Sequence, residues 1–316
     1  MTDKKIIAVI GATGAQGGGL ARAILDDSEG SFALRAITRN VGSDRARALA
    51  DAGAEVVAAD MDDEAQLAEA LEGAYGAFFV TNFWEHFSPE KEATQARNLA
   101  RAAKAAGLRH CIWSTLEDTR KRVPLDDERM PTLMEHYKVP HFDAKGAANA
   151  IFRELGVPTT YLYTSFYWDN LIHFGSGPQR GEDGSLGFVL PMGDAKLPGI
   201  AVEDIGRCAY GIFSEGLDHV GREIGIAGEH LSGAEMAAAL SEALGEPVAH
   251  VDVDPATYRT FDFPGADDLG NMFQYKHDFE EEFRARRDVA RSRELNPRLQ
   301  SFAQWLQQHG NEIPID

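Results

Sequence analysis

An apolar segment that runs directly into three evenly spaced glycines is the feature that most constrains this chain. Residues 5–10, Lys-Ile-Ile-Ala-Val-Ile, lead into Gly11-x-x-Gly14-x-x-Gly17. A segment this apolar is typical of a strand buried on both faces, as in a parallel sheet. A helix is expected to open near Ala15, which completes the strand-turn-helix arrangement of a dinucleotide-binding site.

The three glycines have separate expected tasks in such a turn. One allows a sharp turn, one lets the backbone approach a pyrophosphate, and one lets the helix pack closely on its strand. The phosphates would bind the unpaired N–H groups at the start of the helix. The spacing differs from the G-x-G-x-x-G of typical dehydrogenases and matches the variant of extended and atypical short-chain reductases. The alternative is an ordinary glycine-rich turn, which the flanking strand and helix make less favoured.

Apolar strand segments alternate with alanine-rich helical segments along the first half of the chain. This alternation predicts an α/β fold with a doubly wound parallel Rossmann sheet. Beyond about residue 165 the alternation loosens, so we expect a smaller carboxyl-terminal α/β lobe over 166–316 for a substrate or partner. The Rossmann domain is expected over 1–165 and can recruit later strands. The expected strands are 5–10, 33–38, 55–58, 76–80, 109–113 and 158–163, and the expected helices are 15–27, 43–52, 63–71, 89–106, 142–155, 232–245 and 278–293.

The charge of the chain limits its partners. The 316 residues carry a formal net charge of −19. Such an acidic surface repels nucleic acid phosphates and anionic membranes, so direct binding to either is not expected. The absence of a signal peptide and of a long apolar run predicts a soluble cytoplasmic protein. Cys111 lies in an apolar strand pattern, which favours a buried reduced thiol over a redox pair.

The end of the second strand indicates which dinucleotide is expected. NAD-binding proteins place a carboxylate there for the ribose 2′-hydroxyl. This chain has Ala36-Ile37-Thr38-Arg39-Asn40 instead. The planar guanidinium of Arg39 matches the geometry of a 2′-phosphate and can also stack on adenine. The pattern therefore predicts NADP(H), although exposed arginines at strand ends are also common without a ligand.

Two further strand ends carry polar residues at the edge where such sheets bind ligands. After the third strand, Asp60-Met61 places a carboxylate where it can reach the adenine amino group. Asp60 is explained equally well as a helix cap or turn residue. After the fourth strand, Thr81-Asn82-Phe83 lies where the ribose is expected.

Together these residues resemble the NmrA-like proteins, which are atypical relatives of the short-chain dehydrogenase/reductases. The resemblance is close to the animal NmrA-like redox sensors and covers nearly the whole chain. It rests on the glycine turn, on Thr38-Arg39-Asn40, Val80-Thr81-Asn82-Phe83-Trp84-Glu85, His141-Phe142-Asp143-Ala144-Lys145-Gly146 and Phe263-Pro264-Gly265-Ala266, and on Asn296-Pro297 and Trp305-Leu306.

The resemblance implies a Rossmann domain with a smaller carboxyl-terminal lobe and NADP(H) as the usual cofactor. It also implies that Tyr167 and Asn170 lie beside the cofactor. The aromatic segment that contains them can equally form a lid between the lobes, because aromatic rings supply much of any buried interface. Some members of the family sense the nicotinamide pool with little or no turnover, whereas related groups reduce quinones or isoflavone-type double bonds.

A histidine stands where short-chain reductases normally carry their catalytic tyrosine. In the usual Tyr-x-x-x-Lys pattern the tyrosine delivers a proton, and the lysine holds the nicotinamide ribose. Here the pattern is His141-x-x-x-Lys145. The spacing keeps both side chains on one helical face, so the role of Lys145 is retained. Imidazole can donate a proton near neutral pH. The alternative is that His141 only caps the helix or hydrogen-bonds to a loop.

Other catalytic chemistries receive weaker support. Ser114 follows the expected fifth strand, where such enzymes orient a carbonyl with a hydroxyl, but a serine there also caps turns. The cluster His136, Tyr137, His141 and Asp143 lacks a settled ligand geometry, so no metal is expected. The sequence has no G-x-S-x-G elbow, which disfavours hydrolysis.

These observations lead to two candidate functions for an NADP(H)-binding protein. The first is a redox sensor or regulator of the nicotinamide pool with little or no turnover and a regulated protein partner, because the usual tyrosine is replaced. The alternative is an NADPH-dependent reductase of a small quinone, enal or carbonyl compound, because Lys145 is retained. The expected catalytic residues are Lys145, His141 and Ser114. The expected cofactor-binding residues are Gly11, Thr13, Gly14, Ala15, Gln16, Gly17, Arg39, Asp60, Met61, Thr81, Asn82, Phe83, Lys145, Tyr167 and Asn170.

Overall fold

The parallel sheet predicted from the sequence is present, with seven strands in the order β11-β6-β5-β4-β1-β2-β3. The computed structural model describes residues 4–315. Six of the strands match the expected segments closely, whereas β11 was not expected. The α/β fold class is therefore confirmed. The strands are β1 (Lys5–Ile10), β2 (Phe32–Thr38), β3 (Glu55–Ala58), β4 (Gly76–Phe79), β5 (His110–Thr115), β6 (Thr159–Tyr163) and β11 (Glu223–Gly225).

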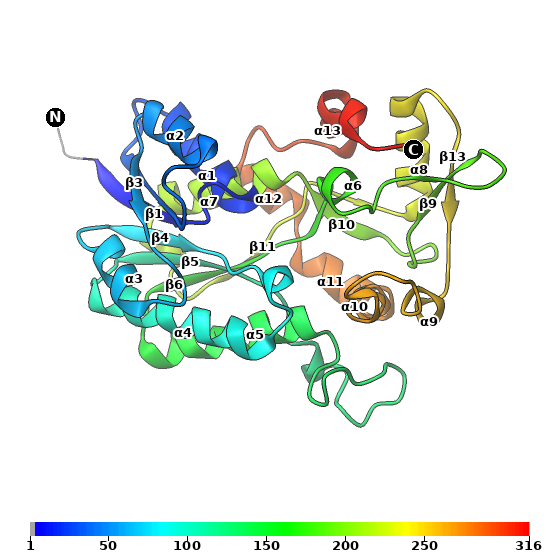
Figure 1. Ribbon diagram of the computed structural model, residues 1–316, viewed down its shortest axis with the longest axis horizontal. Helices are drawn as coiled ribbons and strands as arrows, with labels where there is room; N and C mark the ends of the chain where they lie inside the picture. Colours follow the sequence, from blue (N-terminus) through cyan, green and yellow to red (C-terminus); the bar gives the residue numbers. More distant parts are fainter. Residues whose placement is uncertain (1–3, 316) are drawn as a thin grey trace. The chain divides into compact units, whose positions relative to one another are not determined.

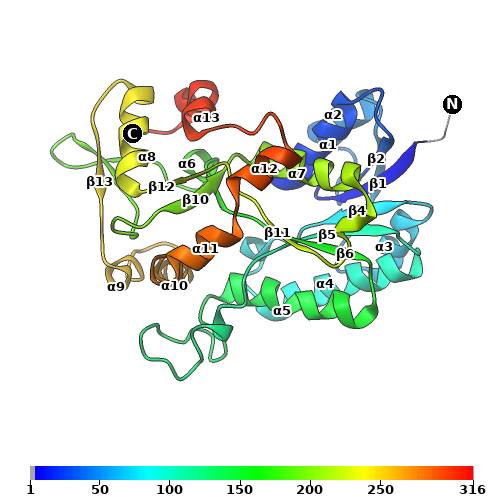
Figure 2. The ribbon, with the colours of Figure 1, turned by 180° about the vertical axis from the view of Figure 1, so that it is seen from behind.

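Helices cover both faces of this sheet (Figure 1), and Figure 2 shows the same two layers from behind. One face carries α1 (Ala15–Asp26), α2 (Asp44–Asp51) and α7 (Val202–Glu215). The other carries α3 (Glu64–Leu71), α4 (Pro89–Ala105) and α5 (Pro140–Leu155). On this second face Leu99 and Phe152 are fully buried in one apolar cluster with Phe79 and Trp113 of the sheet. Burial of both faces explains why the central strands are almost entirely apolar.

The chain folds into two compact units, each made of separate stretches of sequence. The first comprises the chain up to Asp118, Asp143–Thr164 and Glu203–Ile224, and it contains the large sheet. The second comprises Thr119–Phe142, Ser165–Val202 and the chain from Gly225. It contains two mixed three-stranded sheets, β12-β10-β7 and β13-β9-β8. Their strands are β7 (Phe166–Tyr167), β8 (Gln179–Arg180), β9 (Leu186–Val189), β10 (Leu197–Ile200), β12 (Glu229–Leu231) and β13 (Val248–Val251).

The prediction of one helix over 278–293 is wrong. In the structure this stretch contains the end of one helix, the whole of a second and the beginning of a third. Asp288 is the reason for the break before the last segment, since its carboxylate accepts the N–H of Ala290 at 2.8 Å and starts a new helix there. The helices of this unit are α6 (Asn170–His173), α8 (Gly233–Leu244), α9 (Pro255–Tyr258), α10 (Ala266–Asp278), α11 (Glu280–Arg286), α12 (Val289–Leu295) and α13 (Phe302–His309). None of the helices in residues 4–315 combines the length and apolar character needed to cross a membrane.

A buried histidine joins β5 to β6 in the first unit. His110 is fully buried, and its Nε2 lies 2.8 Å from Thr160 Oγ1. The Thr160 hydroxyl donates its hydrogen to the carbonyl oxygen of His219, so His110 must donate from Nε2. Burial, and to a smaller extent the neighbouring His219, lower the pKa of His110 to about 4. The ring is therefore neutral in the folded protein at neutral pH.

This shift predicts that stability falls when the pH is lowered below about 6.5. Between the unfolded pKa of 6.5 and the folded value of about 4, the unfolded chain binds a proton that the folded chain does not. From pH 7 to 5 this lowers the free energy of unfolding by about 2 kcal/mol. His110→Gln keeps an N–H donor for Thr160 but cannot titrate, so urea unfolding of this variant should lose that much less over the same range. Equal losses in both proteins would rule out His110 as the cause.

Candidate functional site

The glycine turn after β1 has the backbone geometry that a pyrophosphate site requires. Gly11 has a φ of 66°, a left-handed conformation that other residues rarely adopt. A Cβ at Gly17 would lie 2.4 Å from the Gly11 carbonyl oxygen, so α1 packs directly on the end of β1. The N-cap of α1 is the exposed Gly14, and within the described chain no side chain caps this helix. No side chain at the N-cap therefore competes with an anion for the first N–H groups of α1.

Two arginines lie at the edge of the sheet where this turn begins, one expected and one not. Arg39 follows β2 and forms a bidentate ion pair with Glu85, with both nitrogen–oxygen distances at 3.0 Å. Arg45, in the first turn of α2, donates from Nη1 to the carbonyl oxygen of Thr13 at 3.2 Å. Arg45 thus contacts the glycine turn, and Arg39 directly follows β2, the strand next to β1.

The residues after β3 stabilise a turn. The Asp60 carboxylate accepts the N–H of Asp62 at 2.9 Å, as in an Asx turn. The carbonyl oxygen of Met61 accepts a hydrogen bond from the Asn98 side chain at 2.9 Å. This Asx turn supports the alternative interpretation of Asp60 as a turn residue. The adenine contacts expected of Asp60 and Met61 stay predictions.

The residues after β4 lead into a short 3-10 helix, η1 (Phe83–Glu85). The amide of Asn82 donates to Glu85 Oε1 at 3.3 Å. Phe83 is buried and packs edge-on against Trp84, with ring centroids 5.6 Å apart. Phe87 just beyond has a positive φ of 52°, which is unusual for a bulky residue. The ribose contact expected for Asn82 and Phe83 stays a prediction.

Lys145 is held by three hydrogen bonds within the first unit. Its Nζ donates to the carbonyl oxygen of Thr81 at 2.8 Å and to Thr81 Oγ1 at 2.7 Å, and it forms an ion pair with Glu92 Oε1. The Glu92 side chain is fully buried, and 11% of the Lys145 side chain is exposed. These contacts tie α5 to α4 and to the end of β4. The expected contact of Lys145 with a ribose stays a prediction, and so does the same role for Thr81.

The second oxygen of the Glu92 carboxylate has no hydrogen bond within the described residues. Glu92 Oε2 lies 3.6 Å from His86 Nε2, which is too long for a hydrogen bond, and within the described chain neither atom has another hydrogen-bond partner. His86 Nδ1 accepts the N–H of Ser88 at 3.1 Å, so a neutral ring carries its hydrogen on Nε2, toward Glu92. The buried carboxylate therefore depends on Lys145 as its ionic partner.

Ser114 and Gln16, both predicted site residues, meet in the first unit. The Ser114 hydroxyl is buried in β5 and donates to Gln16 Oε1 at 2.7 Å. Gln16 belongs to the first turn of α1. In this conformation Ser114 positions the Gln16 side chain, and its expected role toward a substrate carbonyl stays a prediction.

His141 is held by a carboxylate from α10 in the second unit. Its Nδ1 lies 2.7 Å from Asp268 Oδ1, and its backbone N–H donates to Asp268 Oδ2 at 3.2 Å. The side chain of His141 is 7% exposed and that of Asp268 is 4% exposed. Asp268 therefore caps the start of α5 and also fixes the orientation of the imidazole ring. The capping group is thus the Asp268 carboxylate, and His141 is the residue whose backbone N–H it accepts.

Tyr167 and Asn170 also belong to the second unit. Tyr167 ends β7, which pairs in parallel with β10, so that Tyr167 lies opposite Ile200. Asn170 begins α6 directly after Asp169, whose carboxylate accepts the N–H of Val202 at 3.0 Å. Burial raises the pKa of Asp169 above its usual value. The place of Tyr167 and Asn170 beside a cofactor stays a prediction.

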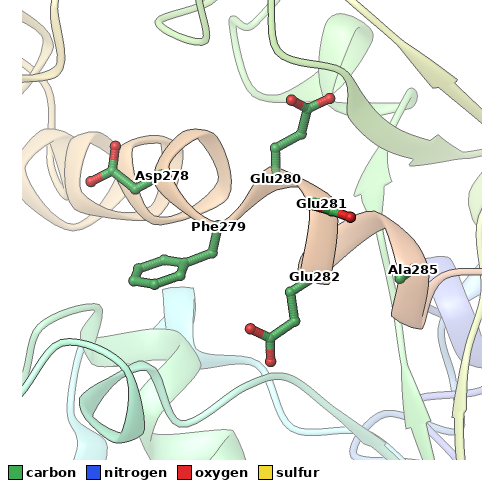
Figure 3. Close-up of a pocket in the computed structure, with 6 residues that line it drawn as sticks. All are labelled: Asp278, Phe279, Glu280, Glu281, Glu282 and Ala285. Carbon is green, nitrogen blue, oxygen red and sulfur yellow. The ribbon is translucent and has the colours of Figure 1, made fainter.

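A surface pocket of 430 Å³ in the second unit involves none of the predicted site residues. Glu280 on its wall accepts the backbone N–H of Lys196 at 2.9 Å and pairs with Arg284 at 2.9 Å, and Glu282 pairs with Arg122. A wall of four carboxylates without a basic lining residue is unsuited to a nucleotide phosphate. The lining residues are Asp278, Phe279, Glu280, Glu281, Glu282 and Ala285 (Figure 3).

The sequence did not single out four residues that contact the predicted site residues. No local pattern links three of the pairs, because the separations are 46 positions for Glu85 and Arg39, 53 for Glu92 and Lys145, and 127 for Asp268 and His141. Arg45 offered a signal, because a basic residue in the first turn of the helix that follows β2 opposes the helix dipole and calls for another explanation.

Comparison with known proteins identifies the group. The chain matches the NmrA-like family over residues 3–306. It belongs to the NmrA-like family. FrzB of Cladobotryum sp, an NmrA-like family domain-containing oxidoreductase, is 31% identical over 284 residues, which cover 84% of this chain and 81% of FrzB. An NAD(P)H azoreductase of Xenophilus azovorans is 28% identical over 250 residues, with coverage of 78% and 77%.

The fold is also shared with solved structures. NmrA, a negative transcriptional regulator, is similar in its complex with NAD (TM-score 0.78) and in its complex with NADP (TM-score 0.77). Each comparison has 24% sequence identity and covers 99% of this chain and 96% of NmrA. The family resemblance and the fold expected from the sequence are therefore confirmed.

Proposed function

We propose that this chain is an NADP(H)-dependent oxidoreductase that reduces a small quinone, enal or carbonyl compound. The observation that carries the proposal is the uncapped helix start at Gly14, with Arg39 and Arg45 at the same edge of the sheet. The helix start would bind the pyrophosphate, and the two arginines are suited to an additional phosphate. Relatives named as oxidoreductases and an azoreductase support turnover. They favour it over the regulator with little or no turnover that the sequence placed first.

The residues of the first unit fit a phosphorylated dinucleotide. The left-handed Gly11 and the close packing at Gly17 leave the N–H groups of α1 accessible to a pyrophosphate. Arg39 would bind the 2′-phosphate. When bound, NADPH supplies the hydride. The proton is assigned to the imidazolium form of His141, in which Nδ1–H donates to Asp268 and Nε2–H is the proton that is released.

Replacing Arg39 by alanine is expected to weaken NADPH binding selectively. A charge-assisted hydrogen-bonded contact to phosphate contributes roughly 1.5–3 kcal/mol, so the Kd for NADPH should rise about 10- to 100-fold. The Kd for NADH should change by no more than about threefold, because NADH has no 2′-phosphate. Isothermal titration of both reduced cofactors measures the difference. Arg101→Ala is the matched control, since Arg101 is also an exposed arginine in an ion pair, with Glu64.

Turnover is tested by following NADPH oxidation in the presence of quinones, enals and aldehydes. The proposal expects consumption with at least one of these acceptor classes and a loss in His141→Gln that exceeds any loss of NADPH affinity. NADPH binding without turnover across the panel would favour the regulator instead. Failure to bind either dinucleotide would contradict both functions.

A further inference from the structure

We propose that Glu85 sets the preference between NADP(H) and NAD(H) by competing with the 2′-phosphate for Arg39. The inference rests on the proposed function, because it requires a dinucleotide at the glycine turn. It assigns a selectivity role to a residue outside the second strand, where the sequence showed an arginine and no carboxylate.

The geometry supports this competition directly. Both terminal nitrogens of Arg39 are paired with the two carboxylate oxygens of Glu85, each at 3.0 Å. This is the bidentate arrangement that a phosphate would also use, so the two anions compete for one fork. Asn82 donates to Glu85 Oε1 at 3.3 Å and holds the carboxylate from a second side. Glu85 is thus positioned at the end of η1, beside the carboxyl end of β4, which neighbours β1 in the sheet.

The two cofactors differ in what they require of this pair. A 2′-phosphate must separate Arg39 from Glu85, and it then lies near a carboxylate of like charge. A 2′-hydroxyl imposes neither requirement. In NAD-binding Rossmann proteins a carboxylate at the end of the second strand accepts its hydrogen, and Glu85 is paired with Arg39, the residue that follows this strand. Glu85 therefore disfavours NADP(H) and supplies the carboxylate that the second strand lacks.

The exposure of the pair indicates the size of the effect. The Arg39 side chain is 61% exposed and that of Glu85 is 44% exposed. Water screens such a pair, so it opens readily and does not exclude NADP(H). We expect a moderate bias in affinity rather than an absolute choice.

Glu85→Gln tests the inference, because it removes the charge and retains an oxygen for Asn82. We expect the Kd for NADP⁺ to fall about three- to tenfold and the Kd for NAD⁺ to stay equal or rise, as measured by isothermal titration. The gain for NADP⁺ should shrink in Arg39→Ala/Glu85→Gln relative to Arg39→Ala, and an undiminished gain would show that Glu85 does not act through the arginine fork.

Glu64→Gln is the matched control for net charge. Glu64 lies in the same unit, is 48% exposed and pairs with Arg101 at 3.3 Å. Its substitution should leave the ratio of the two dissociation constants unchanged. If the wild type binds both dinucleotides and Glu85→Gln shifts the ratio no more than Glu64→Gln, this inference fails and the proposed function stands. If the wild type binds neither dinucleotide, both fail.

Discussion

Replacing Lys145 by alanine is expected to destabilise the protein by about 3–5 kcal/mol, which is a large part of the stability of a typical domain. The reason is Glu92, whose carboxylate is fully buried and has Lys145 as its ionic partner. Its other oxygen lies 3.6 Å from His86 and makes no hydrogen bond within the described chain. Removal of the ammonium group therefore leaves a buried charge uncompensated, and Thr81 loses two contacts as well.

Urea unfolding of the wild type and variants measures this loss. Arg101→Ala is the matched control, because it breaks an exposed ion pair with Glu64 and should cost no more than about 1 kcal/mol. Lys145→Met/Glu92→Gln removes both charges and keeps an acceptor for the Thr81 hydroxyl, so it should recover at least half of the loss. A Lys145→Ala variant as stable as Arg101→Ala would show that the pair contributes little.

This expectation changes how activity measurements at Lys145 are interpreted. A loss of turnover in Lys145→Ala would follow from partial unfolding as readily as from a lost contact with a ribose. A catalytic role therefore requires that Lys145→Met/Glu92→Gln folds, binds NADPH and still fails to reduce an acceptor. Retained turnover in the folded double variant would restrict Lys145 to a structural role.

The secondary structure was predictable where a short stretch of sequence carries both an apolar pattern and residues that mark the end of the strand or helix. The apolar run of β1 and the glycine turn predicted both the strand and the helix after it. The stretch 278–293 failed because its mixed charges fit one helical face, whereas the side chain of Asp288 starts a separate helix. The strand β11 has three residues, Glu223–Gly225, too few for any periodicity to be visible.

The candidate site was less predictable than the fold, for a physical reason. Strand ends could be assigned to one edge of the sheet, because parallel strands share the direction of their carboxyl ends. The partner of each charged side chain could not be assigned, since it depends on tertiary contacts. Lys145 was expected to retain the ribose-binding role, and its partners are Glu92 and Thr81. Asp268, the carboxylate that orients His141, comes from a helix 127 residues away.

The second large effect is expected at Gly17 and not at its neighbour Gly18. Both are buried helical residues of α1. A Cβ at Gly17 would lie 2.4 Å from the Gly11 carbonyl oxygen and 2.8 Å from that of Ile10. Both are backbone atoms, so α1 must move away from β1. We expect Gly17→Ala to cost about 3 kcal/mol or more of stability, at the upper end for an overpacked core, and to weaken dinucleotide binding at least about tenfold.

Gly18→Ala provides the matched control with the opposite sign. A Cβ there would lie 3.4 Å from the Ala12 carbonyl oxygen and 3.4 Å from the tip of the Arg22 side chain, which are ordinary contacts. Alanine is favoured over glycine inside a helix by about 1 kcal/mol, so this variant should be as stable as the wild type or more stable. Urea unfolding and NADPH titration of the two variants give a direct comparison. If Gly17→Ala matches Gly18→Ala in both measurements, close packing of α1 on β1 is not what builds the phosphate site, and the proposed binding mode loses its structural basis.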